Sequence, residues 1–88
     1  RPDLRIAARA QLDWGMDRAQ LYDDLLLAER HVAMGARKIE RQKELIASFA
    51  RDGHDSKVAG ELLELFEQTQ MAHLADLQRL RAELAKTV

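Results

Sequence analysis

The chain lacks cysteine entirely, and Pro2 is the only proline among its 88 residues. Without cysteine there is no disulfide, no thiolate metal site and no cysteine nucleophile. Because proline is the residue that most strongly interrupts a helix, nothing after Pro2 forbids helix by itself. Aromatic residues are also scarce, with two phenylalanines, one tryptophan and one tyrosine.

Long apolar runs and an excess of one charge are missing too. The longest apolar run, 25–28, is far shorter than the roughly 20 residues that span a bilayer. The net charge is −1, with 14 basic and 15 acidic residues, whereas nucleic-acid-binding domains usually carry a basic excess. No signal-peptide pattern opens the sequence. We therefore expect a cytoplasmic protein with no nucleic-acid partner and no membrane contact.

What remains is a composition typical of long amphipathic helices. Apolar residues make up 47% of the chain and charged residues 33%, and Ala, Leu, Glu, Arg and Gln are frequent. We expect one all-α domain over residues 1–88. Two glycines suggest where helices end: Gly15, followed by Asp17 as a possible N-cap, and Gly53, followed by Asp55 or Ser56. The sequence predicts a short helix at about 4–14 and long helices at about 18–51 and 57–86.

Both long segments carry seam residues in a sustained 4-3 alternation, the spacing of a left-handed coiled coil. The short connection around Gly53 makes the two helices antiparallel, so the sequence predicts a coiled-coil helical hairpin. The predicted seams are Leu21, Leu25, Ala28, Val32, Gly35, Ile39, Gln42, Ile46 and Phe49, and Ala59, Leu63, Phe66, Gln70, His73, Leu77, Leu80, Leu84 and Thr87.

Polar residues on the seam give a hypothesis for the register. Pairing Gln42 with Gln70, near His73, forms a polar layer that fixes register as a buried asparagine does. A register shifted by one heptad places His31 near Asp76 instead, and the sequence leaves both registers open.

A second apolar stripe lies off the seam on the helix at 57–86, and further apolar residues lie off the seam on the helix at 18–51. A contiguous exposed apolar surface of this kind marks an interface. A second hairpin packing on it would form a homodimeric four-helix bundle, and a different helical protein is the other candidate partner. A monomeric three-helix bundle is the alternative, but the helix at 4–14 is too short to cover helices more than twice its length. The predicted interface residues are Val58, Leu62, Leu65, Ala72, Leu26, Leu27 and Met34.

Catalytic motifs are missing from the sequence. It contains no nucleophile–base pair in a recognisable motif, no glycine-rich phosphate loop and no Glu-x-x-His repeat of di-iron bundles. His73 would need further converging ligands to hold a metal. We therefore expect no enzyme activity, metal, cofactor or small-molecule substrate. The favoured function is a structural, protein-interaction or oligomerisation module.

The alternative function rests on His31 and Gly35. Histidine phosphotransfer domains use a similar His-x-x-x-Gly arrangement, in which glycine makes room beside the phosphorylated imidazole. Those domains carry a basic residue immediately before the glycine, where this chain has Met34. His31 is thus a candidate phosphoacceptor of a signalling bundle. The competing interpretation is that His31 flanks the seam and Gly35 allows close helix approach.

The stretch from Leu27 to Leu84 resembles short uncharacterised helical-hairpin proteins of alphaproteobacteria, notably rhizobial ones. This resemblance implies a bacterial cytoplasmic protein and no particular activity. It is carried by Ala28-Glu29-Arg30-His31, Gly35, Ile39-Glu40-Arg41-Gln42, Asp52-Gly53-His54-Asp55, Phe66-Glu67 and His73.

Overall fold

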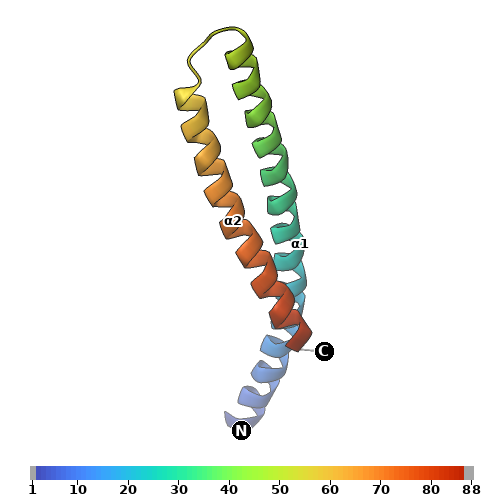
Figure 1. Cartoon of the computed structure of the whole chain (residues 1–88). Coiled ribbons are helices and arrows are strands. Elements are labelled where there is room, and N and C mark those ends of the chain that lie inside the picture. The colour runs from blue at the N-terminus through green and yellow to red at the C-terminus, as the bar shows by residue number, and fades with distance from the viewer. Residues whose placement is uncertain (1, 87–88) are drawn as a thin grey trace.

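The computed structural model describes the backbone of residues 2–86 and the side chains of residues 18–86. It consists of two helices, α1 (Pro2–Arg51) and α2 (Lys57–Lys86). The helices lie antiparallel and form a hairpin, and the chain as a whole measures 75 × 22 × 14 Å (Figure 1). The predicted all-α hairpin is therefore confirmed.

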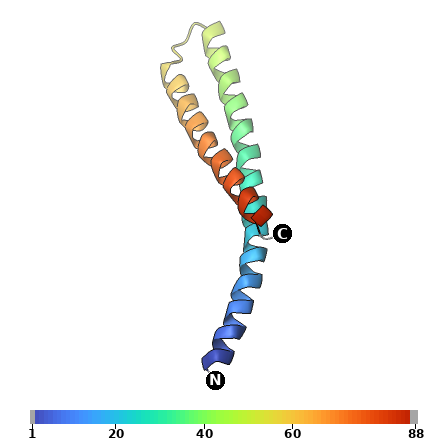
Figure 2. The same ribbon diagram turned by 60° about the horizontal axis from the view of Figure 1, so that its bottom comes forward.

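The predicted break at Gly15 is wrong, because α1 continues as one helix of 50 residues through this position. Its N-terminal part projects past the end of α2 (Figure 2). A glycine inside a helix costs about 1 kcal/mol, and an N-cap such as Asp17 contributes about the same amount. Signals of this size state a local preference. They end a helix only where tertiary packing also requires a turn.

The predicted turn at Gly53 is confirmed, and it ends α1 in a Schellman motif. Gly53 has a φ of 72°, in the left-handed region that favours glycine. The backbone N–H of Gly53 donates to the carbonyl of Ala50 at 3.3 Å, and that of His54 to the carbonyl of Phe49 at 2.8 Å. These two bonds satisfy carbonyls that the end of a helix leaves without partners.

The first turn of α2 is capped by the two residues that the sequence offered for this role. The Asp55 carboxylate accepts a hydrogen bond from the backbone N–H of Lys57 at 2.9 Å. The Ser56 carbonyl accepts the first helical bond, from the N–H of Gly60 at 2.8 Å. The connection between the helices is consequently short, and α2 must fold back along α1.

The predicted seam is the interior of the hairpin. Every seam residue from Leu21 to Leu84 is buried or half-buried, and the last predicted one, Thr87, lies outside the described residues. This interior is thin: among the described side chains, only four apolar ones are buried, and none is completely enclosed. The buried apolar residues are Ala28, Ala59, Leu77 and Leu80.

Candidate functional site

Gln42 is the buried polar residue of the seam, and it bonds across the hairpin to the backbone. Its Nε2 donates to the carbonyl of Ala59 at 2.9 Å, and only 7% of the residue is exposed. The methyl side chain of Ala59 leaves the carbonyl of α2 accessible to a side chain from α1. A bond of this kind satisfies an amide that would otherwise be costly to bury.

Gln70 makes the reciprocal contact from α2 to α1. Its Nε2 donates to the carbonyl of Val32 at 2.8 Å, and its amide occupies the space beside Gly35. A Cβ atom at Gly35 would overlap the Gln70 side chain, lying 2.8 Å from its Cδ. A larger residue at position 35 would therefore displace the Gln70 amide, which accounts for glycine at this position.

These two bonds show that the predicted Gln42–Gln70 layer is wrong. Gln42 reaches Ala59 and Gln70 reaches Val32, and Val32 lies ten residues, or about 15 Å, before Gln42 along α1. Each glutamine faces a small residue and a backbone carbonyl instead of the other glutamine.

The observed register is the alternative shifted by one heptad. The contact that this alternative predicts is observed, since His31 and Asp76 line the same hollow. The physical reason lies at the open end of the hairpin, where Leu21 and Leu25 pack against the buried cluster of Ala28, Leu77 and Leu80. With Gln42 opposite Gln70, Leu21 would lie beyond the end of α2 and lose this burial.

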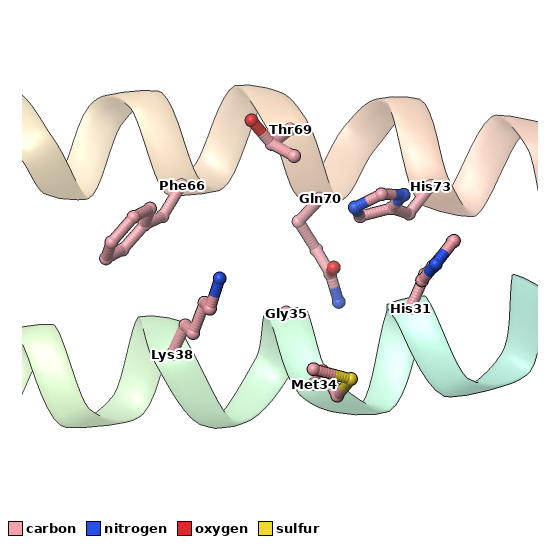
Figure 3. A pocket seen from close by; sticks show the side chains of 8 residues that line it. All are labelled: His31, Met34, Gly35, Lys38, Phe66, Thr69, Gln70 and His73. Carbon is pink, nitrogen blue, oxygen red and sulfur yellow. The ribbon is translucent and has the colours of Figure 1, made fainter.

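The register brings His31 and His73 together at the middle of the hairpin. Their ring centroids are 5.0 Å apart, with the ring planes tilted by 37°, and both residues are half-buried. They line a pocket of about 240 Å³ between the helices (Figure 3). The pocket is completed by Met34, Gly35, Lys38, Phe66, Thr69 and Gln70.

The predicted interface residues are all exposed, and six of the seven lie on one side of the hairpin. Each of the six immediately precedes a seam residue, and a helix turns by about 100° per residue. In an antiparallel pair, positions that precede the seam on both helices lie on the same side. We call this side the apolar face. It comprises Leu27, Met34 and Leu45 from α1 and Val58, Leu62, Leu65 and Ala72 from α2.

Leu26 does not belong to this face, so the seven predicted interface residues do not all share one side of the hairpin. It follows the seam residue Leu25 and lies on the other side of the hairpin. Tyr22, Met71 and Leu74 share that side, which we call the opposite face. The sequence reasoning missed these three residues and Leu45, although their spacing from the seam identifies them.

Charges on the apolar face are divided between its two ends. Lys38 and Arg41 lie toward the loop, and the Lys38 Nζ is 5.9 Å from the centroid of the Phe66 ring. Toward the open end, Arg79 bonds Asp76 at 2.7 Å and Glu83 at 3.2 Å. The hydrogen bond that the Arg79 guanidinium donates to Asp76, the negative charge of Asp76 and the nearby Glu83 raise the pKa of this guanidinium. Asp24 adds a further acidic group at this end.

The geometry around His31 bears on the phosphotransfer hypothesis. The Gln70 amide fills the space beside Gly35. The glycine is therefore not evidence of free space for a phosphoryl group on His31. The His31 ring packs against His73 instead. His31 as a phosphoacceptor stays a prediction from the sequence alone.

Comparison with known proteins adds no function. No protein family, curated protein or solved structure is significantly similar to this chain. The resemblance to alphaproteobacterial hairpins therefore stays a prediction. Over the described part of the chain, neither helix contains a stretch apolar enough to cross a bilayer.

Proposed function

We propose that this protein is a helical oligomerisation module whose apolar face packs against the apolar face of a second copy, giving a four-helix bundle. The observation that carries the proposal is the concentration of six predicted interface residues and Leu45 on one side of the hairpin. An exposed apolar surface of this extent marks an interface. A cytoplasmic bacterial location, as the sequence suggests, suits such a module.

The accessible surface of the chain supports this proposal. A compact monomer of 10.1 kDa exposes about 5,300 Å², whereas this chain exposes 7274 Å². The excess of about 2,000 Å² belongs to the whole elongated chain, including the part of α1 that projects past α2, and it leaves the hairpin with surface that a partner can bury. The small number of buried side chains in the seam also favours a dimer, because the hairpin gains stability when its apolar face is buried as well.

The charges on the apolar face favour a second copy over an unrelated helix. Lys38 and Arg41 lie toward the loop. Toward the open end, the carboxylates of Asp24, Asp76 and Glu83 outnumber the Arg79 guanidinium. When two copies pack with their loops at opposite ends, the basic half of each faces the acidic half of the other. This arrangement has the twofold symmetry of most homodimers. It also disfavours the parallel arrangement by repulsion between like charges.

Light scattering coupled to size-exclusion chromatography tests the proposal. We expect a mass of twice 10.1 kDa at micromolar concentration. Leu62→Glu places a charge on the apolar face and should shift the mass to that of the monomer. The matched control is Leu74→Glu, since Leu74 is as exposed as Leu62 (42% and 41%) but lies on the opposite face.

A monomeric mass for the unchanged protein across this concentration range would refute the proposal. Equal effects of Leu62→Glu and Leu74→Glu would also contradict it, because they would show that the dimer does not use the apolar face. Circular dichroism on both variants checks that each remains helical, so that a lower mass can be assigned to dissociation of the dimer and not to unfolding.

A further inference from the structure

We propose that His31 and His73 bind a divalent transition-metal ion, of which Zn²⁺ is the test case, with the side-chain oxygen of Gln70 as a third ligand. The sequence predicted no metal site, because it showed no further ligands converging on His73. The observed register brings His31 and His73 to the same pocket from opposite helices (Figure 3).

The separation of the two rings matches a shared metal ion. A ring nitrogen about 2.1 Å from zinc places the ring centroid about 3.2 Å from the metal, so two imidazoles at a tetrahedral angle have centroids about 5.3 Å apart. The observed distance between the His31 and His73 centroids is 5.0 Å. With one nitrogen of each ring turned toward the ion, this separation would fit a shared metal without a change in the helices.

Gln70 supplies the second, independent observation. Its Nε2 is bonded to the Val32 carbonyl, but its Oε1 is buried and has no hydrogen-bond partner. This oxygen lies against Gly35, and a turn of the amide toward the two rings would let a metal ion satisfy the otherwise costly buried acceptor. Figure 3 shows the Gln70 amide beside His73, within the same pocket.

The donor set defines the class of ion. Among the described residues, no third His, Cys, Asp or Glu joins the two histidines, so the protein supplies two imidazoles and one amide oxygen. Imidazole suits zinc, copper and nickel better than magnesium or calcium, which prefer oxygen ligands. The remaining coordination positions face the pocket, where water can complete the shell.

The charged residues around the pocket affect the affinity for the metal ion but do not occupy the site. Lys38 lines the pocket from α1, and its Nζ lies over the Phe66 ring. Asp76 and Arg79 line the adjoining hollow beside His31 and are bonded to each other. Because the Lys38 charge repels a cation, Lys38→Gln should raise zinc affinity severalfold.

Calorimetric titration of the full chain with ZnCl₂ tests the site. We expect one zinc ion per chain with micromolar affinity, and a rise in melting temperature when zinc is present, because ligands stabilise the state that binds them. His31→Gln and His73→Gln should each lower the affinity at least tenfold. The matched control is His54→Gln, which alters the exposed histidine of the loop and should leave the affinity unchanged.

Ring C–H signals in NMR give a readout that does not depend on variants. On zinc addition the signals of His31 and His73 should shift together, while those of His54 stay in place. The proposal is overturned if no zinc binds at millimolar concentration, or if His31→Gln or His73→Gln binds zinc as tightly as the unchanged chain.

The ligands all come from one chain, but the pocket is lined by Met34 of the apolar face, which the proposed dimer would cover, so zinc binding is compared in the unchanged protein and in Leu62→Glu. Zinc binding should persist in Leu62→Glu whether or not that variant is monomeric. Loss of zinc binding in Leu62→Glu while its helical content is unchanged would contradict a site formed by one hairpin.

Discussion

The amide of Gln70 lies in the space that Gly35 leaves open, and from there it bonds the Val32 carbonyl of the opposite helix at 2.8 Å. This relationship sets the axial position of α2 on α1 at the middle of the hairpin. The contact of Gln42 with the Ala59 carbonyl repeats it nearer the loop. Together the two contacts fix the register through side chain–backbone bonds.

The first prediction is that Gly35 and Gln70 are energetically coupled. Gly35→Ala gains helix propensity of about 1 kcal/mol but displaces the Gln70 amide and its hydrogen bond, which is worth about as much. The single variant should therefore be neutral or destabilised. In a Gln70→Ala background the same substitution should stabilise the protein by about 1 kcal/mol, because the obstruction is gone. Urea unfolding at one fixed protein concentration measures all four members of the cycle.

Gly60→Ala serves as the control for helix propensity in this cycle. No atom lies within 4 Å of a Cβ placed at Gly60, so alanine should stabilise α2 by up to about 1 kcal/mol in either background. If Gly35→Ala behaves like Gly60→Ala in the presence of Gln70, the coupling is absent.

The second prediction concerns the register, which cysteine cross-linking can read because the chain has no cysteine of its own. His31→Cys with His73→Cys should be joined rapidly within one chain by a short thiol cross-linker. Ile39→Cys with His73→Cys, the pair that the Gln42–Gln70 register brings together, should react slowly, since residues 31 and 39 are about 12 Å apart along α1. The reverse order of rates would show that the observed register is wrong.

The third prediction concerns the turn. Gly53 has a φ of 72°, and a Cβ there would meet no atom within 4 Å. Gly53→Ala should therefore destabilise the hairpin by about 1 kcal/mol through backbone strain alone, whereas Gly53→Asn should cost less because asparagine tolerates this conformation better. Urea unfolding followed by circular dichroism compares the two, and equal stabilities of glycine and alanine at this position would contradict the account.

Much of the fold was predictable from local pattern. The 4-3 spacing identified each seam residue from Leu21 to Leu84, and the Gly53 turn with its caps was located correctly. Such features depend on residues close in sequence, so a single amino-acid sequence is enough to predict them. The apolar stripe was also visible, although its division into two faces, with Leu26 on the other side from Leu27, needs the seam as a reference.

The sequence by itself determined that this protein is helical, where α1 and α2 meet, and which residues line the seam, because those signals are local and repeat over many turns. Only the tertiary structure decided the register, since both alignments keep seam against seam and differ in long-range burial and in what Gln42 and Gln70 face. It also decided that α1 continues through Gly15, where the local signals to stop are too weak to end a helix. The meeting of His31 and His73 is a consequence of that register, so no local pattern contains it.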